Sequence, residues 1–326
     1  MNMNKPARIV AHALQCLGAI WFTTIAAAAY PERPIRIVGP LPAGTSPDLF
    51  ARHLGQKLSA SLKQPVIIEN RPGANSVIGT GMVAKASADG YTLLDASVQH
   101  VMLKPLLGTL AFDPDKDFAA VATISATEMM LVVPAGSRYS SVTELVAAAK
   151  SRPGELNFAT PGIGSPAHLA GQAFLSATAT SARHIPMKGS TESVAAVVGN
   201  QVDYTVTAIS NALPLIQGGR LRPLASTGTK RHALLPAVPT MREALPVGFV
   251  YETWQALFAP AQTPLSVQEL LNREIVRFLG EADTREFFER YGSSPQPRSL
   301  AESSEFVRQE ARKAVELVKA IGATSQ

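Results

Sequence analysis

The chain has 326 residues, of which 46% are hydrophobic and 17% are charged, and its formal net charge is +5. The basic residues are scattered rather than gathered into a stripe with aromatic residues, so the composition does not predict binding to nucleic acid. A chain of about 300 residues can bury a large core and usually divides into two domains.

The first 29 residues have the pattern of a secretory signal peptide. Lys5 and Arg8 precede an apolar stretch, and Ala27 and Ala29 fit the small-residue rule for cleavage. We expect cleavage after Ala29, because the apolar stretch is short for the alternative, a membrane anchor. Cleavage there would remove the single cysteine of the chain and leave 28 basic against 25 acidic residues. The pattern predicts export of a protein without disulfides or thiol catalysis.

From Tyr30 onward, short apolar runs alternate with helical stretches, which is typical of α/β units around a largely parallel sheet. We expect strands at 35–39, 66–69, 128–134, 156–160, 183–187, 202–206 and 250–259, and a further strand that begins at about 91. We expect helices after each Ser-Pro pair, at 77–87, after Ser141, before Gly199, and at 267–280, 283–291 and 300–321. The extended segments near 130 and 250 would join two lobes, 30–128 with 252–326 and 129–251.

Two stretches of the chain repeat one local design. The segments "GPLPAGTSPDLFARHL" (39–54) and "ATPGIGSPAHLAG" (159–171) each pass from an apolar run through Gly and Pro to a Ser-Pro pair. We expect Ser46 and Ser165 at the N-cap of a helix, each followed by proline at the first helical position. Glycine lets the backbone turn sharply, and the free amides and dipole of the helix start favour an anion.

Such helix starts on two lobes, facing across a cleft, would hold an elongated anion at both ends. Gly44, Thr45 and Ser46 would donate to one end, and residues 162–165 to the other. Charge-assisted hydrogen bonds contribute roughly 1.5–3 kcal/mol each, and a micromolar site needs about 8 kcal/mol, so a few donors suffice. The alternative is that these are ordinary strand-to-helix turns, which bind nothing in many α/β proteins.

Catalytic and metal-binding motifs are weak in this sequence. Ser165 and His168 could suggest an exported serine hydrolase, but Ile163 stands where the nucleophile elbow has glycine. "KGSTE" (188–192) lacks the leading glycine of a phosphate loop, and "DPDKD" (113–117) is not a calcium loop. Histidines and acids form no cluster with metal-ligand spacing. We therefore expect no catalytic residue, cofactor or metal, with the hydrolase as a rival hypothesis.

Two further residues bear on the cleft. Asp48 and Arg52 are four residues apart on one helix, so we expect them to pair and steady the first loop. Trp254, in an expected crossing strand, belongs either to the core or to the cleft wall.

Several segments resemble one known family. "YPERPIRIV", "PAGTSPDLFARHL", "PVIIENRPGANSVIG", "ADGYTLL", "FDPDKDF", "NFATPGIGSPAHLAG" and "LPAVPTMREA" are similar to the Bug, or TctC-like, receptors of tripartite tricarboxylate transporters. The resemblance runs from about Tyr30 to the C-terminus. It implies a type II periplasmic-binding-protein fold, with two α/β lobes joined by crossing strands around a ligand cleft. It also implies a periplasmic location, no catalysis, and a carboxylate held by the loops that match 41–46 and 160–165. The cargo would pass to a membrane permease, or in some members the receptor would report to a sensor kinase.

The chain departs from the family pattern at several places. Leu41, Ala43 and Thr45 alter the first loop, Lys104 stands where relatives have Asn, and Thr207 stands where many have an acid. Losing a negative charge and gaining a positive one would favour a fully anionic ligand over one that carries an ammonium group. We expect a monomeric receptor for a di- or tricarboxylate that closes about a hinge. Its expected ligand-binding residues are Leu41, Ala43, Gly44, Thr45, Ser46, Ser97, Gln99, Thr160, Gly162, Ile163, Gly164, Ser165, His168, Lys188 and Thr207.

Overall fold

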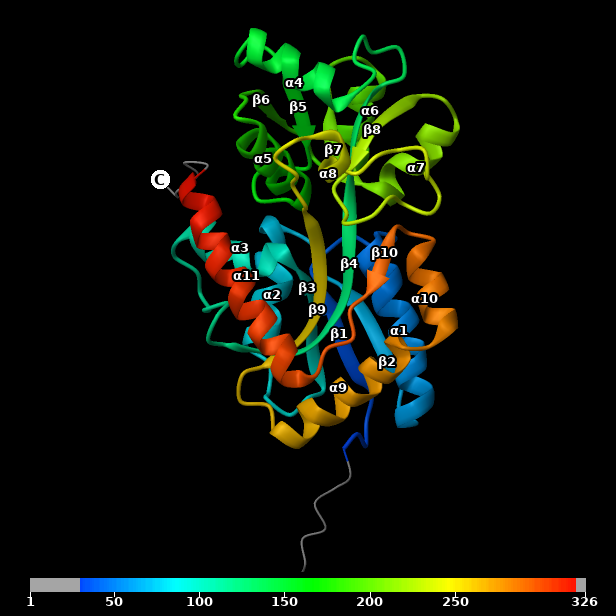
Figure 1. Ribbon diagram of the computed structural model, residues 1–326. Coiled ribbons are helices and arrows are strands. Elements are labelled where there is room, and N and C mark those ends of the chain that lie inside the picture. The colour runs from blue at the N-terminus through cyan, green and yellow to red at the C-terminus, as the bar shows by residue number, and fades with distance from the viewer. Residues whose placement is uncertain (1–29, 321–326) are drawn as a thin grey trace, which may run out of the picture.

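One long strand belongs to both halves of the molecule. The computed structural model describes residues 30–320, and in it β4 (Phe118–Pro134) runs upward from a lower lobe into an upper lobe (Figure 1). Residues 118–128 of β4 pair with β9 (Glu252–Pro260), whereas residues 129–134 pair with β7 (Thr205–Ala208) and β8 (Leu221–Ser226). The chain therefore passes between the lobes in β4 and returns into β9, as the extended segments near 130 and 250 predict.

The lower lobe is built on a mixed sheet. Its strand order is β10-β4-β9-β3-β1-β2. β1 is parallel to β2 and β3, but β9 is antiparallel to both β3 and β4, and β10 is antiparallel to β4. The expectation of a largely parallel sheet is therefore wrong here, because β9 re-enters the lobe in the direction opposite to β4. The remaining strands are β1 (Ile35–Gly39), β2 (Val66–Asn70), β3 (Thr92–Ser97) and β10 (Ser293–Pro295).

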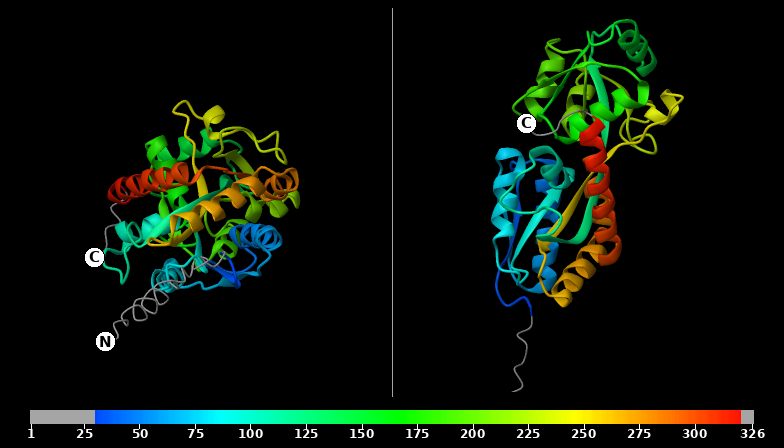
Figure 2. Two further views of the ribbon diagram at one scale, coloured as in Figure 1. Left: turned by 90° about the horizontal axis from the view of Figure 1, so that it is seen from below. Right: turned by 90° about the vertical axis from the view of Figure 1, so that its left-hand side faces the viewer.

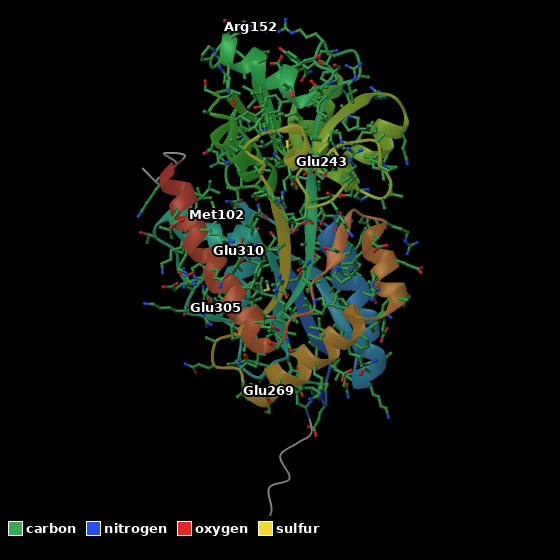
Figure 3. The ribbon with its side chains drawn as sticks, in the orientation of Figure 1. Met102, Arg152, Glu243, Glu269, Glu305 and Glu310 are labelled. Carbon is green, nitrogen blue, oxygen red and sulfur yellow. The ribbon has the colours of Figure 1, made fainter. Side chains whose placement is uncertain are left out.

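Helices cover the lower sheet on both sides, and α11 lies along the lobe up to its boundary with the upper lobe (Figure 2). Trp254 of β9 donates a hydrogen bond through Nε1 to Glu310 Oε2 of α11 at 2.9 Å, and its side chain is buried, so Trp254 belongs to the core. Figure 3 labels Glu310 on α11. None of the described helices is both long and apolar enough to cross a membrane. The helices of this lobe are α1 (Ser46–Leu62), η1 (Ala74–Ser76), α2 (Val77–Ala84), α3 (Val98–Leu107), α9 (Leu265–Leu279), α10 (Ala282–Glu289) and α11 (Leu300–Ala320).

The upper lobe packs helices on both faces of the β4 extension. Met129, Leu131 and Val133 belong to one apolar cluster, and Met130 and Val132 to another, as alternation along a strand requires. Both faces are buried, which explains the continuous apolar run at the end of β4. The other elements are α4 (Val142–Ser151), β5 (Asn157–Thr160), α5 (Pro166–Thr178), β6 (Arg183–Pro186), α6 (Ser190–Val198), α7 (Ile209–Gln217) and α8 (Met241–Ala244).

Most expected elements are present, with three differences. β4 starts at Phe118 rather than at residue 128, and β7 starts at Thr205 rather than at 202. The segment after the strand at 92–97 is the helix α3, which is not among the expected helices, and Pro105 lies inside it. Pairing with β9 extends β4 beyond its most apolar stretch, which no local pattern reveals.

Candidate ligand-binding site

The first helix start lies one residue earlier than the Ser-Pro pair suggests. Thr45 is the N-cap of α1, so Ser46 is the first helical residue and Pro47 the second, and the expected N-cap role of Ser46 is wrong. Proline still loses nothing at this place, because the amides of the first turn have no partner within a helix.

A buried carboxylate holds this loop. Asp48 accepts hydrogen bonds from the Gly44 amide at 2.8 Å, from Asn70 Nδ2 at 2.9 Å and from Arg52 Nε at 3.1 Å. The expected pair of Asp48 and Arg52 is confirmed. Burial alone would raise the pKa of Asp48, but the hydrogen bonds from Arg52, Gly44 and Asn70 outweigh it and lower that pKa.

The occupied Gly44 amide changes the expected donor set. It donates to Asp48 rather than toward a ligand, and the Thr45 hydroxyl donates to the Pro42 carbonyl at 2.9 Å. Within residues 30–320, the amides of Ala43, Thr45 and Ser46 have no hydrogen-bond acceptor. These three amides are the free donors of the first loop.

The second helix start has the expected cap. Ser165 is the N-cap of α5; its Oγ accepts from the His168 amide at 3.3 Å and donates to the Gly162 carbonyl at 2.7 Å. Pro166 follows at the first helical position. Here the local sequence alone is sufficient to place the helix start.

The amides of the second loop are largely used within the loop. Gly162 N donates to Thr160 Oγ1 at 3.2 Å, Gly164 N donates to His168 Nδ1 at 3.2 Å, and Ser165 N donates to the Gly162 carbonyl at 3.2 Å. In this structure three of the four amides of residues 162–165, which we expected to donate to a ligand, therefore have acceptors within the loop and the first turn of α5. The amide of Ile163, whose side chain is exposed, has no acceptor in the described part of the chain.

Each helix start lies against the opposite lobe. Ser46 Oγ of the lower lobe donates to Ser210 Oγ of α7, in the upper lobe, at 2.9 Å. Gly164 of the upper lobe lies so close to Leu106 of α3 that a Cβ atom at Gly164 would collide with Leu106 Cδ1. Leu169 of α5 is also buried in an apolar cluster of the lower lobe. Both loops therefore lie at the boundary between the lobes.

Ser210 was missed by the sequence reasoning. It lies in the first turn of α7, but the chain enters this helix directly from β7 without Gly or Pro. Glycine-containing turns mark the two predicted helix starts. The tight junction between β7 and α7 contains no glycine, so the sequence gives no such signal for Ser210.

The other expected site residues lie in several environments. Gln99 Nε2 donates to Asn75 Oδ1 at 3.3 Å, and Asn75 lies close to Gly164, so Gln99 is near the second loop. Ser97 is buried at the start of α3. Thr207 is buried and accepts from Asn211 Nδ2 at 3.3 Å. The Lys188 side chain is exposed to solvent.

Lys104 is not available as a free positive charge. Its Nζ lies 2.9 Å from Asp113 Oδ2 and 3.1 Å from Asp115 Oδ2. The hydrogen bonds that Lys104 donates to these two carboxylates raise the pKa of Lys104, and the carboxylates neutralise its charge locally. The suggestion that Lys104 adds a positive charge for the ligand is not supported by this geometry.

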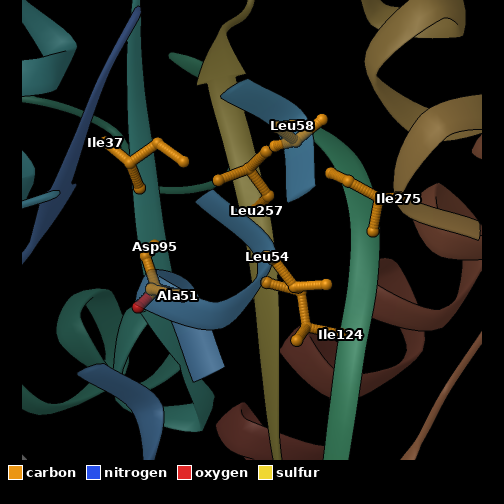
Figure 4. A pocket seen from close by; sticks show the side chains of 8 residues that line it. All are labelled: Ile37, Ala51, Leu54, Leu58, Asp95, Ile124, Leu257 and Ile275. Carbon is orange, nitrogen blue, oxygen red and sulfur yellow. The ribbon is translucent and has the colours of Figure 1, made fainter. Parts of the chain in front are cut away.

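A small apolar cavity lies between α1 and the lower sheet. Seven aliphatic side chains and Asp95 line it (Figure 4), and its volume of about 10 Å³ is enough for roughly one water molecule. Asp95 Oδ1 accepts from Gln255 Nε2 at 2.6 Å, and the same nitrogen donates to the Pro47 carbonyl at 2.9 Å. Burial raises the pKa of Asp95 to about 8, so this carboxyl is mostly uncharged at neutral pH.

The arrangement does not support the rival hydrolase. The Ser165 hydroxyl is bonded to the Gly162 carbonyl, and neither ring nitrogen of His168 contacts it. A nucleophile and its base must lie within hydrogen-bond reach. Among residues 30–320 no group of three or more His, Cys, Asp or Glu is placed to hold a metal ion.

Comparison with known proteins gives consistent matches. The family model described as "Tripartite tricarboxylate transporter family receptor" matches residues 50–323. Protein BugT of Bordetella pertussis is 34% identical over 325 residues, which is 99% of each chain. The structure of R. palustris Rpa4515 with adipate has a TM-score of 0.82 at 30% identity and covers 90% of this chain and 98% of that one. MatC (Rpa3494) from Rhodopseudomonas palustris with bound malate has a TM-score of 0.78 at 29% identity, covering 89% and 100%.

Proposed function

Because this chain belongs to the tripartite tricarboxylate transporter family of receptors, we propose that it binds a small organic carboxylate in the periplasm. The observation that carries this proposal is the pair of helix starts, one on each lobe, that lie at the lobe boundary. Among the described residues, the first loop presents the free amides of Ala43, Thr45 and Ser46, and the second loop presents the free amide of Ile163. Helix starts attract anions, and a carboxylate at each end of a small molecule would complement both.

The ligand would be a dicarboxylate without an ammonium group. The two similar structures named above contain adipate and malate, both dicarboxylates. Thr207 offers no carboxylate to an ammonium group, whereas the family resemblance leads us to expect an acid at this position. The preference depends on this missing acid, because Lys104 is already paired with two aspartates.

Binding would be coupled to closure of the lobes, 30–128 with 252–326 and 129–251. A ligand that bridges both helix starts stabilises only the state in which they are close, so it shifts the equilibrium toward that state. The hydrogen bond between Ser46 and Ser210 and the contact of Gly164 with Leu106 would belong to that closed state. The remaining expected residues, Leu41, Ala43, Ser97, Gln99, Thr160 and Lys188, would shape the site around the bound anion.

A thermal-shift series tests the ligand class directly. The protein without residues 1–29 is measured with adipate, malate, succinate and citrate, and with aspartate and glutamate as the matched amino-bearing acids. A ligand at one hundred times its dissociation constant adds about 2.7 kcal/mol of stability, which is easily detected. We expect dicarboxylates without an amine to give the larger shifts. Equal or larger shifts with aspartate or glutamate would contradict the preference, and no shift with any acid would contradict carboxylate binding.

The receptor would hand its ligand to a two-component membrane permease. Loss of uptake of the identified carboxylate on deletion of this gene would support that role. Retained uptake, with loss of a ligand-dependent transcriptional response, would instead favour reporting to a sensor kinase. The expected signal peptide lies outside the described residues, and N-terminal sequencing of the periplasmic protein tests cleavage after Ala29.

A further inference from the structure

The conformation of the second loop is held by the buried imidazole ring of His168. We propose that His168 is a positioning residue of the binding site: its neutral imidazole fixes the Gly164 amide and leaves the Ile163 amide free for the ligand carboxylate. This inference rests on the proposed function, but it assigns His168 a role other than contact with the ligand. The contacts that support this role are those of His168 with Gly164, of Gly162 with Thr160 and of Thr160 with the imidazole ring of His184.

His168 holds the C-terminal side of the loop. Its Nδ1 accepts from Gly164 N at 3.2 Å, so in the neutral ring the proton is on Nε2. The side-chain amide of Gln172 lies 3.4 Å from Nε2 and in this tautomer presents its oxygen to that proton. The same residue's amide donates to Ser165 Oγ at 3.3 Å, which closes the helix cap. Gly164 has φ +77°, a left-handed conformation that few residues other than glycine adopt readily, and the ring holds the loop in it.

Thr160 and His184 hold the N-terminal side of the loop. Thr160 Oγ1 accepts from Gly162 N at 3.2 Å and lies 2.5 Å from His184 Nε2. The rings of His168 and His184 lie 4.3 Å apart between centroids. The amides of Gly162 and Gly164, on either side of Ile163, therefore donate to Thr160 and His168. Within residues 30–320 the Ile163 amide between them has no acceptor, so it is free to donate to a ligand.

The surroundings keep His168 neutral. Its side chain is 4% exposed, and the titratable group that faces it from a neighbouring element is His184 of β6. Burial, followed by repulsion from His184, lowers the pKa of His168 to about 4. A proton on Nδ1 would set two donors against each other and release the Gly164 amide.

This geometry predicts an unusual sign for the pH dependence. If His168 acted as a charge partner of the anion, protonation would strengthen binding. If it positions the loop as a neutral acceptor, protonation weakens binding. Affinity should be constant well above pH 4 and should fall as the pH decreases toward His168's pKa, beyond any loss caused by protonation of the ligand itself.

The test compares two substitutions by calorimetry with adipate and malate. His168→Asn keeps an acceptor near the position of Nδ1, and His168→Leu removes it. At pH 7.5 we expect the Leu variant to bind at least tenfold more weakly and the Asn variant to stay within about threefold of the wild type. Between pH 6 and pH 4 the wild type should lose affinity relative to the Asn variant, which carries no titrating ring. A gain relative to that variant, or equal affinities of all three proteins, would overturn the proposal.

Nitrogen NMR of the wild-type rings gives an independent readout if the Leu variant does not fold. We expect His168 to be neutral at pH 7 with its proton on Nε2, and the opposite tautomer or a charged ring would overturn the proposal. The outcomes also separate the two hypotheses. A wild-type protein that binds no carboxylate contradicts the proposed function, whereas binding that is unaffected by His168→Leu contradicts only the role of His168.

Discussion

The two loops at the lobe boundary share a local design but differ in what supports them. The first loop, at α1, is exposed and is held by the charged carboxylate of Asp48. In the second loop, at α5, Gly164 and Ser165 are buried, and its amides are held by neutral acceptors, Thr160 and His168. A resident negative charge at the first loop offsets part of the positive potential of its helix start. We therefore expect the second loop to contribute more to the binding of an anion.

The largest effect should come from Gly164→Ala, with Gly44→Ala as its matched control. Both glycines have positive φ, +77° and +81°, so both substitutions carry similar backbone strain of about 1–3 kcal/mol. A Cβ at Gly164 also collides with Leu106, whereas the space around Gly44 is open. We expect calorimetry to show at least tenfold weaker binding for Gly164→Ala than for Gly44→Ala.

A second substitution, at Leu106, tests whether the collision at Gly164 causes the loss of affinity. Leu106→Ala should recover part of the affinity of Gly164→Ala, because it removes the atom that blocks closure. Equal losses for the two glycine variants, without recovery by Leu106→Ala, would show that the close contact between the lobes is not needed for binding.

Removing the charge that supports the first loop should be the next largest effect. Asp48→Asn loses the charge-assisted hydrogen bonds that the buried Asp48 carboxylate accepts, so we expect about 1–3 kcal/mol less stability in urea unfolding at pH 7. Because the pKa of Asp48 is lowered in the fold, its contribution is complete above the unfolded value of 3.8 and is lost as the pH falls below that value. The difference in stability between the wild type and the variant should therefore shrink as the pH falls below 3.8. A constant difference across this range would assign the effect to packing.

The buried carboxyl behind the first loop should show the opposite pH dependence. The pKa of Asp95 is raised from 3.8 to about 8, so between these values the folded state holds a proton that the unfolded state releases. The stability of the wild type therefore falls as the pH rises through this window. We expect Asp95→Asn to gain at least about 1 kcal/mol relative to the wild type between pH 4 and pH 8. Parallel stability curves would contradict this.

The smallest effect should come from Lys104→Gln. Its partners are Asp113 and Asp115 at an exposed surface, where ion pairs contribute roughly 0.2–1 kcal/mol. We expect less than a twofold change in the affinity for malate or adipate. A tenfold loss would show that this charge reaches the ligand despite its two aspartate partners.

Features that depend on neighbouring residues were predictable from the sequence. The strand, glycine turn and Ser-Pro start of α5 follow local rules, and so does the pairing of Asp48 with Arg52 one turn later. The resemblance to the receptor family, carried by short motifs, agrees with the family match and with the similar two-lobed structures. The three terminal helices were also placed to within a few residues, because their apolar periodicity is strong.

Which donors remain free was decided only by the tertiary structure. The Gly44 amide is taken by Asp48, which Asn70 of β2 also binds, and the Gly162 amide is taken through Thr160, beside His184 of β6. Ser210 reaches Ser46 across 164 residues of sequence. A sequence pattern identifies groups that can donate, but the nearby acceptors that take these amides, such as Asp48 and Thr160, are themselves held by residues of other strands, Asn70 and His184. A hydrogen bond forms with whichever acceptor the fold brings within about 3 Å, and the sequence alone does not specify that distance.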